Sequence, residues 1–265
     1  MDPQPLVLRL SKHVFRVRRN SLVGVGLCLA CVLAACAPRL PRPPVSATAE
    51  PAAVFAAVRQ REDKIHSLRA RFSATVRQGE NLRSAEGVLL VKKPDRFRLR
   101  LLSPFGFTVF DYVSHGTHGR MELPLEGKQL VDDEIGAQSP FSPVDFRQAF
   151  LRGEAAFPGR CTPEATGAEV VVDCRNERGG RLREIRIAET TATVTRETSF
   201  DNEQPRAILQ FDDYRVVDGL PVPFAIALQS PERNLTVQIV LRTYEINPVL
   251  ADALFEPAAA AGPAS

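Results

Sequence analysis

The first apolar pattern of the chain is helical. Four apolar residues recur at close to helical spacing, with charged residues between them: Val54, Val58, Ile65 and Leu68. Pro51 can occupy the first turn of such a helix, where its missing N–H group costs nothing. We therefore expect one amphipathic helix over residues 51–67.

From Arg69 onward apolar and polar residues alternate, which is typical of β-strands with one buried and one wet face. Gly and Pro pairs mark turns between many of the alternating segments. The pattern predicts twelve strands, over residues 69–77, 86–93, 96–101, 107–114, 118–124, 127–132, 168–174, 182–188, 193–200, 206–217, 222–228 and 235–241. A second helix is expected from Ser142 and Pro143 to about Arg152, because Ser can cap it and Pro fits its first turn.

So many alternating strands with so few helices favour a mainly β fold. We expect one strongly curved antiparallel sheet or partial barrel, filled in part by the N-terminal helix. A void beside that helix would be apolar and would suit acyl chains better than polar metabolites. Five inward residues are candidate lining of such a cavity, or plain core: Phe72, Val76, Phe97, Leu99 and Leu101. The arginines between them on residues 96–100 are interpreted as a solvent-exposed row rather than a headgroup site.

The first 35 residues have the composition of an export signal. A basic segment precedes a 14-residue apolar run, Leu22 to Ala35, which is shorter than the 18 or so residues of a membrane-spanning helix. The run ends in Leu-Ala-Ala-Cys at Cys36, which resembles the lipobox of bacterial lipoproteins. The resemblance implies cleavage before Cys36 and acylation of its thiol. Ala37 stands where an aspartate would resemble an inner-membrane retention signal, so an outer-membrane anchor facing the periplasm is expected.

Removing this leader changes the charge of the chain. The sequence has 34 basic and 31 acidic side chains, of which the leader holds five and one, so 29 and 30 remain. The basic excess belongs to the leader and therefore does not indicate a nucleic-acid partner.

The remaining chain is long enough for one domain with a sizeable core. We expect a signal peptide over residues 1–35, a flexible tether over 36–50, the β domain over 51–257 and a disordered tail over 258–265. Two of the five cysteines lie in the leader and Cys36 is taken by lipid. Cys161 and Cys174 are left, and in an exported domain they predict one structural disulfide.

The segment Asp95-Arg96-Phe97-Arg98-Leu99-Arg100-Leu101-Leu102-Ser103-Pro104-Phe105-Gly106 resembles a strand and turn of the LolB family, outer-membrane receptors for lipoproteins. With the preceding helix and strands, the resemblance covers roughly residues 52–135. The closing segment from Asn247 to Phe255 is similar to that of the LolA carriers. The resemblance implies a half-open β-barrel with a helical lid that binds acyl chains of other lipoproteins without catalysis. In LolB the turn's apolar residue projects toward the membrane, and Phe105 is the matching position.

Phe105 and Phe107 are also unusual without that resemblance. They place two large apolar side chains on a tight turn, where polar residues are the rule. Exposed, they would contact a membrane or a partner, and otherwise they would fold back into the barrel mouth.

Enzyme signatures are sparse after the leader. The sequence has no Gly-x-Ser-x-Gly and no His-Glu-x-x-His, and neither a catalytic residue nor a cofactor is expected. His115 and His118 can in principle ligate a metal, with Asp111, Asp132, Asp133 or Glu134, although a polar loop explains them as well.

Three functions remain open. The first is a lipoprotein that binds acyl chains and acts in lipoprotein localisation, with lipids or lipoproteins, the outer membrane and a periplasmic carrier protein as partners. The second is a scaffold or regulatory lipoprotein that binds an envelope protein through the same sheet. The third is a metal-dependent hydrolase.

Overall fold

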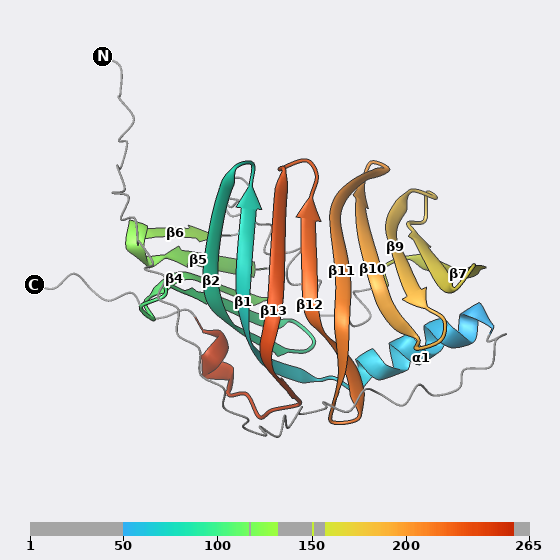
Figure 1. Ribbon diagram of the computed structural model, residues 1–265, viewed down its shortest axis with the longest axis horizontal. Helices are drawn as coiled ribbons and strands as arrows, with labels where there is room; N and C mark the ends of the chain where they lie inside the picture. Colours follow the sequence, from blue (N-terminus) through green and yellow to red (C-terminus); the bar gives the residue numbers. More distant parts are fainter. Residues whose placement is uncertain (1–49, 117, 132–149, 151–156, 257–265) are drawn as a thin grey trace, which may run out of the picture. The chain divides into compact units, whose positions relative to one another are not determined.

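The computed structural model describes residues 50–116, 118–131, 150 and 157–256 (Figure 1). The described residues all lie in one compact unit. A helix, α1 (Pro51–Asp63), precedes the strands. The strands of the described part are β1 (Ser67–Gln78), β2 (Asn81–Lys92), β3 (Arg96–Leu102), β4 (Thr108–His115), β5 (His118–Leu123), β6 (Lys128–Val131), β7 (Arg160–Thr166), β8 (Glu169–Arg175), β9 (Arg181–Ala188), β10 (Thr193–Asp201), β11 (Gln204–Val217), β12 (Leu220–Ser230) and β13 (Leu235–Ile246). Two short 3₁₀ helices are η1 (Pro124–Glu126) and η3 (Asp252–Phe255).

All thirteen strands belong to one antiparallel sheet in the order β6-β5-β4-β3-β2-β1-β13-β12-β11-β10-β9-β8-β7. Strands that are neighbours in sequence pair with each other, except β6 and β7, which form the two edges of the sheet. At the centre, β1 pairs with β13 as well as with β2. The two edge strands, β6 and β7, lie at opposite sides of the view in Figure 1, so the barrel is half-open. The predicted mainly β, half-open antiparallel barrel with an N-terminal helix is confirmed.

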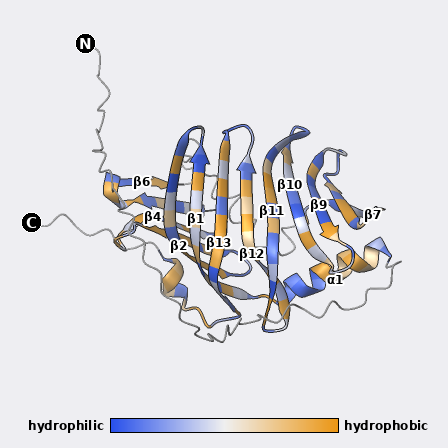
Figure 2. Ribbon diagram, viewed as in Figure 1, coloured by the Kyte–Doolittle hydropathy of each residue, from blue (hydrophilic) through white to orange (hydrophobic). Residues whose placement is uncertain are grey.

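The alternation in the sequence becomes two faces of this sheet, as the alternating colours along each strand in Figure 2 show. Inward side chains of nearly every strand form one buried apolar cluster, and we call the side that carries them the inner face. α1 adds Val54, Phe55 and Val58 to the same cluster and contacts β7 and β8. The helix therefore fills part of the sheet's hollow, as the periodicity predicts.

The predicted helix end was wrong by one turn. α1 ends at Asp63, and Leu68 is a buried residue of β1 instead of the last helical contact. The cause is Asn247, distant in sequence: its Oδ1 accepts hydrogen bonds from the backbone N–H groups of His66 (2.7 Å) and Ser67 (3.2 Å). Its Nδ2 donates to the carbonyl of Lys64 at 2.9 Å. Helical spacing carries no information about such a tertiary contact.

The sequence pattern did not predict one of the strands, β7. β7 contains Pro163 and is mostly exposed, so it lacks the alternation that marks the other strands. It is an edge strand held by pairing with β8, where Cys161 lies directly opposite Cys174. The predicted disulfide joins these two residues.

The arginine row of β3 is not a solvent-exposed face at Arg98, which is only 9% exposed. The segment after β13 folds back over the outer face: Arg98 Nη1 donates to the carbonyl of Leu254 at 2.8 Å, and Arg96 pairs with Asp252 at 2.8 Å. Phe255 packs in a small buried cluster with Val113 and Leu250. The exposed interpretation failed because alternation does not show what covers a strand's outer face.

Several sequence predictions lie outside the described residues. They are the signal peptide over residues 1–35, the tether apart from Glu50, the helix expected from Ser142 apart from Phe150, and the tail over 258–265. No described helix has the length and apolar character needed to cross a membrane.

Candidate functional site

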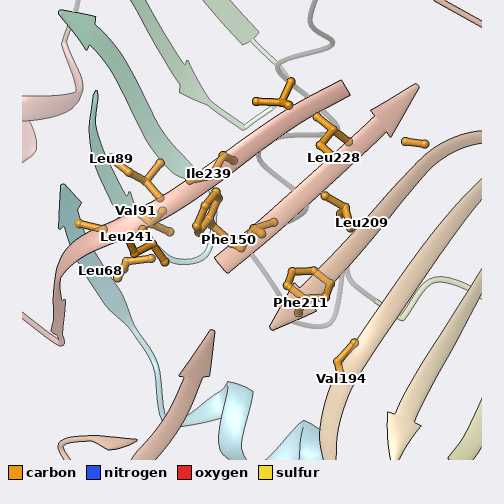
Figure 3. Close-up of a cluster of buried hydrophobic side chains, with 14 of the residues drawn as sticks. Leu68, Leu89, Val91, Phe150, Val194, Leu209, Phe211, Leu228, Ile239 and Leu241 are labelled. Atoms are coloured by element: carbon orange, nitrogen blue, oxygen red, sulfur yellow. The ribbon is translucent and has the colours of Figure 1, made fainter. Parts of the chain in front are cut away.

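The buried apolar cluster of the inner face contains residues of β1–β6 and β8–β13. Figure 3 shows its central part, in which Phe150 is one of the buried side chains. Phe211, Leu228 and Ile239 are each at most 4% exposed. A side chain buried to this degree already packs against other parts of the protein, so an acyl chain contacts it only by displacing them.

The five candidate lining residues belong to this cluster. Phe72, Phe97 and Leu99 are fully buried, while Val76 and Leu101 are partly buried and pack against the cluster. None of the five lines the cavity described next, so a role as ligand wall stays a prediction.

A cavity of about 50 Å³ lies between α1 and strands β10, β11, β12 and β13. Its wall combines apolar and polar side chains: Val58, Arg61, Glu62, Ile65, Phe150, Ala192, Thr193, Val194, Tyr214, Leu220, Pro221, Val222, Pro223 and Tyr244. An engineered apolar cavity of about 150 Å³ takes up benzene. The cavity as it stands is smaller than that, and Phe150 occupies the space beside it.

Arg61 fixes the helix side of this cavity. Its guanidinium donates to the carbonyls of Ala57, Thr191 and Ala192 and thereby ties α1 to the turn before β10. Burial lowers the pKa of Arg61 from its ordinary value. Tyr214 closes the opposite wall, because its hydroxyl donates to the carbonyl of Val194 at 2.6 Å. These polar groups hold the wall in place.

An ion pair interrupts the apolar inner face. Arg183 of β9 and Glu197 of β10 lie 3.2 Å apart, with side chains only 4% and 2% exposed. Sequence reasoning missed this pair. A signal was present in the alternation of β9. Arg183 lies two and four residues before Ile185 and Ile187, which point inward, so its side chain points to the same face.

The β3–β4 turn resolves the two alternatives for Phe105 in favour of exposure. Phe105 is 86% and Phe107 is 67% exposed. The turn is rigidly built: the N–H group of Gly106 donates to the carbonyl of Ser103 at 2.9 Å, and that of Phe107 to the Ser103 hydroxyl at 3.2 Å. Pro at the second position and Gly at the fourth suit this turn, so the aromatic side chains are held outward.

The disulfide lies beside the inner face, far from that turn. It fixes β7 to β8, and β7 in turn contacts α1. Phe157, just before β7, makes an edge-to-face contact with Phe55 at 5.1 Å between ring centroids. The disulfide thus secures the helix that covers this end of the sheet.

The histidine pair forms no metal centre within the described part of the chain. His115 Nε2 lies 3.5 Å from Asp95 Oδ2, and no described group of three His, Cys, Asp or Glu side chains can hold a metal ion. Asp111 points instead to Arg98 and Arg100. Asp132, Asp133 and Glu134 lie outside the described residues, as do Cys36 and Ala37.

Comparison with solved structures identifies the architecture. A DUF1329 family protein from Desulfovibrio piger superposes with a TM-score of 0.60 and 13% identity over 79% of this chain and 98% of its own. A LolA superfamily protein from Nitrosomonas europaea gives 0.55 and 10% identity, covering 76% of this chain and 97% of its own. The chain has a LolA/LolB-like fold. A domain described as an outer-membrane lipoprotein-sorting protein from Vibrio parahaemolyticus gives 0.58 and 10%, with 76% and 94% covered.

No protein-family model and no curated protein matches the sequence. At these identities the likeness establishes the LolA/LolB-like fold alone. The resemblance in residues 95–106 therefore agrees with the structure at the level of fold.

Proposed function

We propose that this protein is an outer-membrane lipoprotein that binds acyl chains of lipoproteins or lipids against its inner face and acts in lipoprotein localisation. The observation that carries the proposal is the half-open LolA/LolB-like sheet, whose inner side chains are mostly apolar and whose β3–β4 turn holds exposed aromatic side chains. The fold it shares with a lipoprotein-sorting domain supports the proposal. No catalytic step is assigned.

The anchor in this proposal is an acylated Cys36, with Ala37 permitting sorting to the outer membrane. Two or more acyl chains hold a protein firmly, since each buried CH₂ contributes about 0.8 kcal/mol. The 14 residues from Ala37 to Glu50 reach at most about 50 Å from the anchor. A domain of about 200 residues has a radius of gyration of about 16–17 Å. The anchored domain can therefore turn any of its sides toward the membrane.

Uptake of a fluorescent fatty acid or a lipopeptide tests the proposal directly. The described residues from Glu50 to Glu256 lie in one compact unit, so unlipidated residues 37–265 can be used as a soluble protein. We expect saturable binding with an emission shift to the blue. Mass spectrometry of whatever lipid or lipoprotein co-purifies from membranes then identifies the cargo.

Phe105→Glu is expected to impair transfer of bound cargo to liposomes at least about tenfold while changing cargo binding less than twofold. The reason is that Phe105 is exposed on the rim, away from the buried cluster, so a charge there opposes contact with a bilayer without disturbing the inner face. Transfer is measured by fluorescence dequenching. Val249→Glu is the matched control, because Val249 is 97% exposed and follows β13 at the other end of the sheet. Equal loss of transfer in both variants would contradict the role of Phe105.

Phe150→Ala is expected to increase acyl-probe affinity about threefold or more. Phe150 borders the cavity of about 50 Å³, so removal of its ring enlarges an apolar space that the surrounding residues refill only partially. Binding is measured by fluorescence titration. Phe110→Ala is the matched control, since Phe110 is buried to a similar degree, 8% against 9% exposed, but does not line the cavity. Unchanged or weaker binding in Phe150→Ala would place the acyl site elsewhere.

The small volume of that cavity favours a second candidate function, a scaffold or regulatory lipoprotein that binds an envelope protein through the same sheet. Absence of both probe uptake and transfer to liposomes in the soluble protein would leave this function. Cross-linking in membranes, followed by mass spectrometry, would then be expected to yield a protein without associated lipid.

A further inference from the structure

We propose that a second turn acts with the Phe105 turn as a single hydrophobic foot, which inserts into the interface of a lipid bilayer by apolar contact and not by charge. The foot consists of Phe105, Phe107 and Leu125. This inference rests on the proposed delivery of cargo at a membrane. It adds Leu125, a residue on another turn, and a contact that is apolar and insensitive to salt.

Strand register places the two turns at the same end of the sheet. Leu102 pairs with Thr108 across the β3–β4 hairpin, and Asp111 pairs with Glu122 across the next pair of strands. Thr108 lies three residues before Asp111, and Leu125 lies three residues after Glu122. Because β4 and β5 are antiparallel, Thr108 and Leu125 lie at the same level along the two strands. η1 contacts β4. The exposed side chains of both turns thus lie on one rim.

The two turns share three features, although proline is the second of four residues in the Phe105 turn and the first of four in the other. In each, a proline precedes the large apolar residue and a glycine with positive φ ends the turn: Gly106 at +83° and Gly127 at +62°. The N–H group of Gly127 donates to the carbonyl of Pro124 at 3.3 Å, as that of Gly106 does to Ser103 at 2.9 Å. Proline and a backbone hydrogen bond restrict each turn, so the apolar side chain loses little conformational entropy on inserting.

Exposure of these side chains is high. Leu125 is 75% exposed, compared with 86% for Phe105 and 67% for Phe107. Three such residues on two turns at the same end of the sheet form an apolar surface of the kind that marks an interaction site. They project from turns and form no groove, which fits the soft interface of a bilayer better than the shaped surface of a protein partner.

The foot carries no unbalanced charge. The residues from Ser103 to Thr108 are all uncharged, and in the other turn Lys128 Nζ pairs with Glu126 Oε2 at 2.9 Å. Attraction to anionic lipid therefore contributes little, and salt has little to screen. We expect binding to zwitterionic vesicles, with partition changing less than about twofold between 0.05 and 0.5 M NaCl.

The sequence contains no tryptophan, so one introduced indole reports on its own surroundings. Leu125→Trp in residues 37–265 is expected to shift its emission to the blue on addition of phosphatidylcholine vesicles and to be quenched by brominated acyl chains. Val249→Trp, equally placed in solvent at the other end of the sheet, is expected to show neither change. Leu125→Glu is expected to lower vesicle partition in flotation at least about tenfold, as burial of a leucine side chain implies.

Three results would overturn the inference: an unshifted Leu125→Trp, unchanged partition of Leu125→Glu, or binding that requires anionic lipid and disappears at 0.5 M NaCl. Acyl-probe uptake distinguishes failure of this inference about the foot from failure of the proposed acyl-binding function. If Leu125→Glu binds the probe normally and keeps wild-type partition, the foot is wrong and the acyl site stands. If wild-type protein inserts Leu125 but takes up no probe, the foot stands and the cargo proposal fails.

Discussion

Asp111→Ala is expected to lower the free energy of unfolding by about 3–5 kcal/mol, because it leaves a buried guanidinium without its counter-ion. The Asp111 carboxylate accepts two hydrogen bonds from Arg98, at 2.9 Å from Nε and 2.6 Å from Nη2. Arg100 donates two more, at 3.2 and 2.9 Å. The hydrogen bond to Asp111 raises the pKa of Arg98 above its ordinary value. That support is lost in the variant, but a guanidinium does not release its proton in a protein, so the charge of Arg98 stays buried without a partner carboxylate.

Urea unfolding, followed by circular dichroism, measures this loss. A paired control, Arg98→Leu with Asp111→Leu, is expected to lose less than Asp111→Ala alone, because no buried ion is left uncompensated. Arg100 also loses Asp111, but its side chain is 39% exposed and reaches water. Asp213→Ala is the surface control, since the Asp213–Arg215 pair is about half exposed and is expected to change stability by less than about 1 kcal/mol. A loss in Asp111→Ala as small as in Asp213→Ala would show that the Arg98 site is open to water.

The Asp111 cluster also shows what alternation along a strand leaves undetermined. Arg98 and Arg100 stand at outward positions of β3, and the sequence predicts those positions correctly. Their surroundings depend on η3, more than 150 residues later, whose carbonyls accept hydrogen bonds from Arg98. A period of two assigns a face to each side chain but does not identify the segment that covers that face.

The same distinction separates the predicted from the unpredicted parts of the site. Twelve strands, the N-terminal helix and the cysteine pair follow from periodicity and compartment, which are local or compositional signals. β7 gives no such signal because edge strands are short of apolar residues. The Asn247 contact that ends α1 and the Arg183–Glu197 ion pair depend on residues that meet only in the folded sheet.

The sequence did not determine whether Phe105 is exposed or buried, because an aromatic residue on a tight turn is compatible with either. The structure resolves this through hydrogen bonds of the turn itself. Leu125 received no attention in the sequence, although Pro124 and Gly127 flank its turn as Pro104 and Gly106 flank Phe105. This local similarity indicates a shared surface only once strand register places both turns at the same end of the sheet.

Phe72→Ala is expected to lower the free energy of unfolding by about 3–5 kcal/mol, the usual cost of removing a fully buried aromatic side chain. Phe72 is 0% exposed, and its ring lies over Gly87, its partner on β2. A Cβ atom built on Gly87 would overlap Phe72 Cζ. Gly87→Val is therefore expected to cost about 3 kcal/mol by overpacking, although valine favours strands more than glycine does.

The double variant decides whether these two residues act as one packing unit. In Phe72→Ala with Gly87→Val, the valine side chain enters the space left by the ring, so the combined loss is expected to be about 1–2 kcal/mol smaller than the sum of the single losses. Chemical unfolding of the three variants provides the measurement. Additive losses would mean that β2 shifts to relieve the overlap in Gly87→Val. Non-additivity would show that Gly87 is required for the close approach of the Phe72 ring, and hence that the inner face is packed by its own side chains at β1 and β2.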